Sequence, residues 1–179
     1  GANDFGSPSR RGAPLTFRSH MTRPSFAAMW SAFKVIYGDG TLPSVGDRIG
    51  GKVKENIDMG QRDPRAGFRN GCAIRMSYSL NKSGVVIPRG VWSTVSGGDG
   101  KQYIYRLADL ARFLAHRFGS ADKTVRSPKP GDFAGLKGIL IFGVRWSDAT
   151  GHATLWDGGT CSDHCYFPVA AEASIWELR

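Results

Sequence analysis

The chain has 179 residues, of which 41% are hydrophobic and 22% charged, and its formal net charge is +9 at pH 7. A chain of this length and composition has enough interior for one globular domain that stands alone. No stretch approaches the roughly 18 apolar residues of a membrane-spanning helix, so we expect no membrane insertion. The positive charge favours an anionic substrate or partner.

The first 20 residues do not resemble part of a native domain. Residues 6–14 are linker-like, and residues 19–21 resemble a cloning scar before an initiator Met21. We expect residues 1–20 to be an expression tag or linker and residues 21–179 to be a single domain. The first 20 residues contribute three arginines and one aspartate, so the rest carries +7. No signal peptide follows Met21, and export would therefore require another machine.

Apolar residues at helical spacing predict a first helix from Phe26 to Tyr37, ended by the glycine-rich turn 38–40. A second helix is expected after Ser44, which can cap it. Its apolar face consists of Val45, Ile49, Val53 and Ile57. Gly50 and Gly51 lie inside this helix at a cost of about 2 kcal/mol relative to alanine, which suggests close packing there.

The stretch from Asn70 to Asn81 is the one around which the chain is organised. Three apolar residues at spacings of three and four predict a helix: Ala73, Met76 and Leu80. Gly71 allows a sharp turn before it, and Gly84 is the expected stop. Cys72 therefore lies at the helix N-terminus, where unpaired N–H groups and the helix dipole favour a thiolate and can hold an oxyanion. The alternative is a small buried core residue.

The rest of the chain changes from helical to strand-like patterns. Residues 85–88 are expected to be extended, 96–100 to turn, and 107–118 to form a helix ended by Gly119. Four strands are expected after it, at residues 138–144, 152–156, 166–167 and 175–178. Helices first and antiparallel strands later predict an α+β domain, with the N-terminal helical half packed on the C-terminal sheet.

His152 lies at the start of an expected strand, far downstream of Cys72. A histidine at a strand start and a cysteine at a helix start form the arrangement of cysteine hydrolases. We therefore predict Cys72 as the nucleophile and His152 as the general base.

An acidic third residue should orient His152. Asp157 lies five residues further along the strand and points to its opposite face, and Asp148 can cap a turn. If the chain reverses around residues 158–159, Asp163 returns opposite Thr154 on the face of His152. The predicted catalytic residues are Cys72, His152 and Asp163, with Asp157 and Asp148 as weaker candidates. His164 and His116 are expected to be structural or solvent-facing, and Trp146 and Trp156 to belong to the core.

Two further cysteines, Cys161 and Cys165, flank three residues. They are consistent with a disulfide that leaves Cys72 free and suits an oxidising compartment. A metal site fits less well, because no second ligand pair exists and three histidines lie outside the first 20 residues. An extended strand would hold the two Cα atoms about 13 Å apart, so a disulfide requires a loop. We expect neither a metal nor another cofactor.

Six segments together resemble one known family, in family order from Arg23 nearly to the end of the chain. They are Arg23–Phe26, Gly50–Val53, Asn70–Ser77, Asp99–Arg106, Gly135–Ile139 and Asp148–Trp156. The family is the fourth group of type VI secretion amidase effectors, peptidoglycan-cleaving toxins with the papain-like fold of NlpC type.

The resemblance implies hydrolysis of the amide between γ-D-glutamate and meso-diaminopimelate in stem peptides, in the periplasm of a competing bacterium. It implies Cys72 as nucleophile, His152 as base, Asp163 as the acidic residue, and a Cys161–Cys165 disulfide beside them. It also implies the type VI machinery and a cognate immunity protein as partners. Stem peptides carry carboxylates, so Arg75 is a candidate cation near the cleft, with a solvated helix residue as its alternative.

The sequence is also compatible with other functions. A housekeeping cell-wall hydrolase is disfavoured because no signal peptide or wall-binding module is found, and a thiol protease is a second enzyme alternative. A basic nucleic-acid-binding domain would explain the charge, but the positive residues are dispersed and no recognised DNA or RNA motif occurs.

Overall fold

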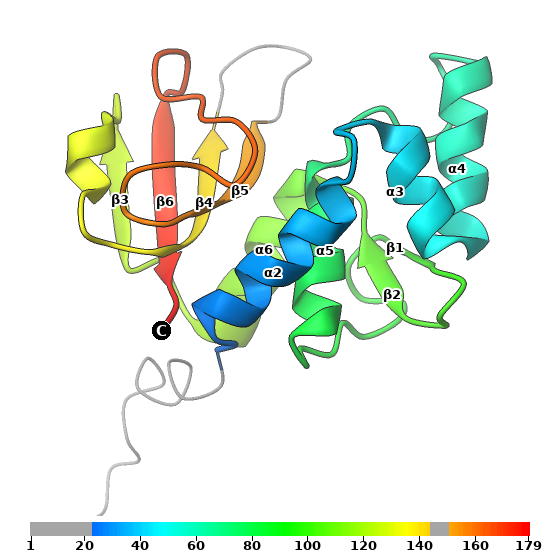
Figure 1. Ribbon diagram of the computed structural model, residues 1–179, viewed down its shortest axis with the longest axis horizontal. Helices are drawn as coiled ribbons and strands as arrows, with labels where there is room; N and C mark the ends of the chain where they lie inside the picture. The colour runs from blue at the N-terminus through cyan, green and yellow to red at the C-terminus, as the bar shows by residue number, and fades with distance from the viewer. Residues whose placement is uncertain (1–22, 144–150) are drawn as a thin grey trace, which may run out of the picture.

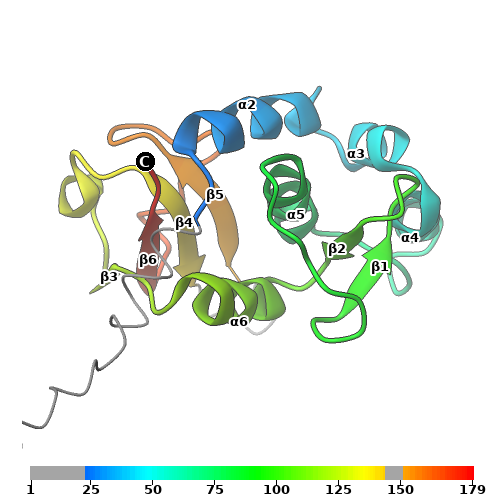
Figure 2. The ribbon, with the colours of Figure 1, turned by 90° about the horizontal axis from the view of Figure 1, so that it is seen from below.

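The computed structural model describes residues 23–143 and 151–179. Its helices gather on one side and its main sheet on the other, with α2, α5 and α6 nearest the sheet (Figure 1 and Figure 2). The helices are α2 (Phe26–Tyr37), α3 (Leu42–Ile49), α4 (Gly51–Arg62), α5 (Cys72–Lys82) and α6 (Leu107–Phe118), with a short 3₁₀ helix η1 (Pro130–Phe133). The strands are β1 (Thr94–Ser96), β2 (Gln102–Ile104), β3 (Lys123–Arg126), β4 (Gly138–Gly143), β5 (His152–Trp156) and β6 (Glu172–Glu177).

The N-terminal helices begin at side-chain caps. The Ser25 hydroxyl accepts a hydrogen bond from the Ala28 N–H and caps α2, whose buried stripe packs against α5. Helix α3 is capped by Thr41, which accepts from the N–H of Ser44, so the predicted cap at Ser44 is wrong by one turn. Thr41 succeeds because its extended backbone places the hydroxyl over the first free N–H groups of the helix.

The single helix predicted across Gly50 and Gly51 is also wrong, because the chain breaks there into α3 and α4. Both glycines have positive φ, 70° and 60°, which α-helical geometry does not allow. The turn at Gly97 and Gly98 lies against this break, and the Gly98 N–H donates to the Ile49 carbonyl at 2.8 Å. A Cβ on Gly51 would lie 2.5 Å from the Gly97 carbonyl carbon. Gly51 thus allows the close packing that its position suggested, whereas a Cβ on Gly50 would make only an ordinary contact, 3.7 Å from the Gly98 Cα atom.

Helix α5 lies at the centre of the molecule, and its residues from Cys72 to Asn81 are all buried. Helix α2 and strands β2 and β5 pack against it. Its buried polar side chains pair with the backbone of β2. The Ser77 hydroxyl donates to the Ile104 carbonyl at 3.2 Å, and the Asn81 amide donates to the Gln102 carbonyl at 2.9 Å. A helix with a polar composition can therefore be buried on several sides with these two side chains paired, although Nε of Arg75 has no hydrogen-bond partner among the described residues.

The main sheet is antiparallel, with strand order β3-β6-β4-β5. Strand β4, the predicted continuous apolar run, lies between β6 and β5 and is covered on both faces. Ile139 and Ile141 join the core that contains α2, α5 and α6, whereas Leu140 and Phe142 join a second core with Phe133. Two covered faces explain why this strand shows no polar alternation.

Three short strands are not predicted from the sequence, and one predicted strand is absent. The missed strands are β1 and β2, which pair with each other, and β3 at the edge of the main sheet. Tyr166 and Phe167 do not form the predicted strand and belong to an irregular segment with a turn. Phe167 is buried there by side-chain packing on Phe142, with ring centroids 4.9 Å apart. Residues 85–88 are not assigned to any strand.

Candidate active site

Cys72 is the first residue of α5, where the sequence predicts it, and it is only 2% exposed. The preceding Gly71 has a φ of −95°, so it is not required for an unusual turn. A Cβ there would lie 2.5 Å from a methyl group of Leu42, so a side chain at this position would require the Leu42 side chain to move. The backbone N–H of Cys72 donates to the side-chain oxygen of Asn70 at 3.0 Å. The N–H group expected to be unpaired is therefore occupied in this structure.

His152 begins β5, and its side chain meets that of Asp163. Nε2 of His152 lies 2.9 Å from Oδ2 of Asp163, and the two side chains are 12% and 2% exposed. The Nε2–H bond is not aligned with the carboxylate, so the contact is an ion pair rather than a linear hydrogen bond. The ring of His152 also packs on Tyr166, with centroids 4.7 Å apart.

The surroundings of His152 favour its charged form. Burial lowers its pKa, but the interactions with Asp163 and with the Cys72 side chain outweigh burial and raise the pKa to about 9. Burial acts in the opposite direction on Asp163, where the proximity of His152 and a hydrogen bond from Thr154 outweigh it and hold the pKa of that carboxyl below its usual value. The structure thus brings Cys72, His152 and Asp163 together around one imidazolium.

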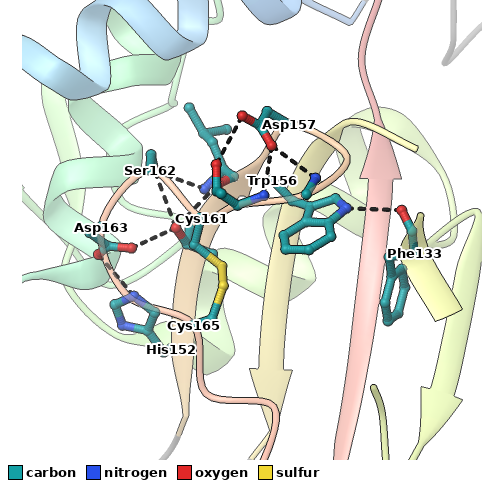
Figure 3. Close-up of a disulfide and its surroundings, with 12 residues drawn as sticks. Phe133, His152, Trp156, Asp157, Cys161, Ser162, Asp163 and Cys165 are labelled. Atoms are coloured by element: carbon teal, nitrogen blue, oxygen red, sulfur yellow. Dashed lines mark hydrogen bonds and ion pairs between the residues drawn. A yellow bond between two sulfur atoms is a disulfide. The ribbon is translucent and has the colours of Figure 1, made fainter. Parts of the chain in front are cut away.

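Asp163 is held by the loop that follows β5 (Figure 3). Cys161 pairs with Trp156 across the chain reversal, which returns Asp163 to Thr154, and the Thr154 hydroxyl donates to Asp163 at 2.6 Å. The predicted disulfide is present between Cys161 and Cys165, with Cα atoms 5.6 Å apart in a loop rather than a strand. It closes the short segment on which Asp163 lies.

The other acidic candidates near His152 do not join it. The Asp157 carboxylate accepts hydrogen bonds from the N–H groups of Gly159 and Thr160, at 2.9 and 2.7 Å, and thereby fixes the turn after β5. These bonds hold the pKa of Asp157 below its usual value against the opposing effect of its slight burial. Asp148 lies outside the described residues, as do Trp146 and residues 1–20.

The remaining histidines and Trp156 behave largely as expected. His116 is exposed and packs beside Trp92. His164 is exposed too, but it lines the same cleft as His152, with Nε2 3.4 Å from the Tyr37 hydroxyl. Trp156 belongs to the core, 1% exposed, and its indole N–H donates to the Phe133 carbonyl at 2.9 Å.

A cleft of about 490 Å³ opens between the helical half and the sheet, beside His152 and Asp163. Sequence reasoning missed two aromatic residues of its lining, Tyr37 and Tyr166, because each carries an ordinary core-like pattern. Arg75 lines the cleft and is buried, which excludes the solvated alternative for this residue. The sequence could have indicated this position of Arg75. Residues three apart lie on the same face of a helix, and Arg75 follows Cys72 by three residues.

Within residues 23–143 and 151–179, no group of three or more His, Cys, Asp or Glu side chains is arranged to hold a metal ion. No helix in those two ranges is long and apolar enough to cross a membrane.

The fold is α+β, with a helical half on an antiparallel sheet, as the sequence pattern predicted, and it is of the papain-like, NlpC type that the family resemblance implied. Residues 68–176 match the family described as type VI secretion system (T6SS), amidase effector protein 4. The chain belongs to this family. A search of curated proteins gave no match.

Solved structures of effectors from this family are similar over most of the chain. One is the effector–immunity complex Tae4–Tai4 from Enterobacter cloacae, with 43% identity and a TM-score of 0.80 over 88% of this chain and 100% of that chain. The effector Tae4 from Enterobacter cloacae has 44% sequence identity and a TM-score of 0.80, over 88% of this chain and 98% of that chain. The Tae4–Tai4 complex from Salmonella Typhimurium has 42% sequence identity and a TM-score of 0.80, over 88% of this chain and 100% of that chain.

Proposed function

We propose that this amidase effector hydrolyses the γ-D-glutamyl–meso-diaminopimelate amide of peptidoglycan stem peptides, with Cys72 as nucleophile, in the periplasm of a target bacterium. The observation that carries the proposal is the meeting of Cys72 with His152 and Asp163, the latter two of which line one open cleft. Family membership supports the amide as the bond class and type VI delivery as the route.

In the proposed reaction, the Cys72 thiolate attacks the amide carbonyl carbon and forms a tetrahedral oxyanion. The carbon–nitrogen bond then breaks, and the His152 imidazolium gives its proton to the leaving amine. The product bound to the enzyme is a thioester. His152, now neutral, takes a proton from water, the resulting hydroxide attacks the thioester, and the thiolate leaves beside a recharged imidazolium. Asp163 orients the ring and stabilises its positive charge throughout.

The oxyanion needs an N–H donor, and the backbone of Cys72 supplies one. In this structure that N–H bonds to Asn70, whose side chain is exposed. The substrate oxygen would replace the Asn70 oxygen during the reaction. One such donor is worth about 3 kcal/mol in other hydrolases.

The proposed partner is a cognate immunity protein that covers the cleft, since similar solved effectors are held in complex with Tai4. We also propose that residues 21–179 form one amidase domain. In support, the N–H of Phe26 at the start of α2 donates to the Arg179 carbonyl at 2.6 Å, which joins the helical half to the strand half at the end of the chain.

The test is digestion of purified peptidoglycan and of a synthetic stem tetrapeptide, with the products identified by mass spectrometry. We expect new amino groups on diaminopimelate from the native protein and none from Cys72→Ala. Asp157→Ala serves as the control, because its carboxylate is tied to a turn away from His152.

Three results would contradict the proposal. Cleavage of protein substrates without cleavage of stem peptides would make the chain a thiol protease. Cleavage that persists in Cys72→Ala would overturn the nucleophile. Retention on DNA without any hydrolysis would favour nucleic-acid binding.

A further inference from the structure

Arg75 is a buried cation that faces the cleft. It lies one helical turn after Cys72 on α5 and is 9% exposed. Its side chain folds back toward the start of the helix, where a Cβ on Gly71 would lie 3.4 Å from its Nη1 atom. Gly71 itself places no side chain against the guanidinium, and a methyl group of Leu42 lies beside the same position.

The guanidinium is only partly paired. One nitrogen, Nη2, donates to the Gly40 carbonyl at 3.2 Å, and the group lies 5.5 Å from the ring centre of Tyr37. Within the described part of the chain, Nε has no hydrogen-bond partner and no carboxylate forms an ion pair with Arg75. A buried cation without an anionic partner is costly, so this position favours the binding of an anion.

The charges around the cleft agree with this. Its lining contains Arg69, Arg75 and the largely protonated His152. The carboxylate in the same lining, Asp163, is already paired with His152. An anion that enters the cleft therefore meets unpaired positive charge at Arg75 and no free negative charge from the lining.

We propose that Arg75 binds the free α-carboxylate of the γ-linked D-glutamate whose amide is cleaved, and so determines specificity on the acyl side; this inference rests on the proposed function. A γ-glutamyl residue places its α-carboxylate carbon four bonds from the scissile carbonyl carbon, about 5 Å when extended. The guanidinium lies close to the start of the helix that carries Cys72, because Nη1 of Arg75 is 3.4 Å from the position that a Cβ would take on Gly71, the residue directly before Cys72. A carbonyl at the sulfur thus brings the carboxylate to the guanidinium, where two parallel hydrogen bonds can form.

A second carboxylate of the substrate, on the diaminopimelate side chain, has the same chemistry but a different reach. It lies seven bonds from the scissile carbonyl carbon, about 9 Å when extended, and on the opposite side of the bond. The span from Cys72 to Arg75 favours the glutamate carboxylate.

The experiment compares three synthetic stem peptides: the acid peptide, the same peptide with the glutamate α-carboxylate as a carboxamide, and a peptide with lysine in place of diaminopimelate. For the native protein we expect kcat/KM to be roughly 10- to 100-fold lower on the carboxamide than on the acid peptide. Arg75→Gln should lower kcat/KM on the acid peptide by a similar factor and leave the carboxamide nearly unchanged. It should still lower the rate on the lysine peptide, whose glutamate is intact.

Two controls separate this role from others. Arg112→Gln removes an exposed arginine of α6 and should alter neither rate. Alkylation of Cys72 by iodoacetamide should proceed at the native rate in Arg75→Gln, because the proposed partner of the guanidinium is substrate rather than the sulfur. Arg75→Lys should retain part of the preference for the acid peptide, since it keeps the charge but loses the planar fork.

Equal native rates on the acid and carboxamide peptides would overturn the inference, whether or not the Arg75 variants fold. If Arg75→Gln lowered kcat/KM equally on the acid and carboxamide peptides and also slowed alkylation of Cys72, Arg75 would instead act on the Cys72 sulfur. An effect of Arg75→Gln that disappears with the lysine peptide would assign it to the other carboxylate. Hydrolysis of neither peptide by the native protein would overturn the proposed function itself, and the inference with it.

Discussion

Replacement of Asp163 by asparagine keeps the side-chain volume but removes the charge that faces His152 at 2.9 Å. The rise of the His152 pKa from 6.5 to about 9 corresponds to about 3 kcal/mol in favour of the imidazolium. Asp163 shares this effect with Cys72 and contributes the larger part. We therefore expect Asp163→Asn to weaken proton binding at His152 by on the order of 2 kcal/mol, or roughly 30-fold, and to lower kcat/KM by at least that factor.

The assay is an NMR titration of the His152 ring, assigned by comparison with His152→Gln, together with the rate on the stem peptide. Asp157→Asn is the matched control: the same substitution on a carboxylate that contacts the turn and not the ring should leave the His152 titration unchanged. If His152 in Asp163→Asn titrates at the native pH, the carboxylate does not hold the proton. The proposed role of Asp163 would then fail even if the activity fell.

Three further predictions concern stability, measured by urea denaturation. The stabilisation from the raised His152 pKa is fully present below pH 6.5 and is lost as pH rises through about 9. The free energy of unfolding of the native protein should therefore fall over this pH range. It should fall less in His152→Gln. Joint replacement of Cys161 and Cys165 by serine should lower the free energy of unfolding by about 2 kcal/mol, the chain-entropy value for so short a loop. An unchanged midpoint of urea denaturation would contradict this. Gly51→Ala, whose Cβ would meet backbone at 2.5 Å, should cost at least about 1 kcal/mol more than Gly100→Ala, which has positive φ but no atom within 4 Å; equal costs would refute the packing argument.

The sequence predicts an element well where one physical cause dominates its pattern. Helix α5 and strand β4 are both found, because helical spacing marks the first and a continuous apolar run marks the second. The position of Asp163 beside Thr154 also follows from local geometry, since a reversal near residues 158–159 leaves little choice of register.

The errors arise where contacts distant in sequence decide the structure. The break at Gly50 and Gly51 depends on contact with the turn at residues 97–98, and the local pattern that predicts this turn does not predict what it packs against. Phe167 is buried because the loop that carries it packs on the sheet. Strand propensity cannot distinguish an apolar residue buried in this way from one in a hydrogen-bonded strand. The burial of Arg75 requires the fold of residues 37–42 over the start of α5. Long-range packing, rather than propensity, placed these residues.

The junction at the beginning of α2 has a consequence for attached cargo. Arg23 pairs with Asp122 at 2.5 Å and also donates to the Glu177 carbonyl, close to where the Phe26 N–H meets Arg179. The cleft is reached at the other end of α2, where Tyr37 lies, and 12 helical residues span about 18 Å. A carrier or reporter protein fused after Arg179 would therefore emerge away from the mouth of the cleft and leave room for a bulky polymer strand to enter.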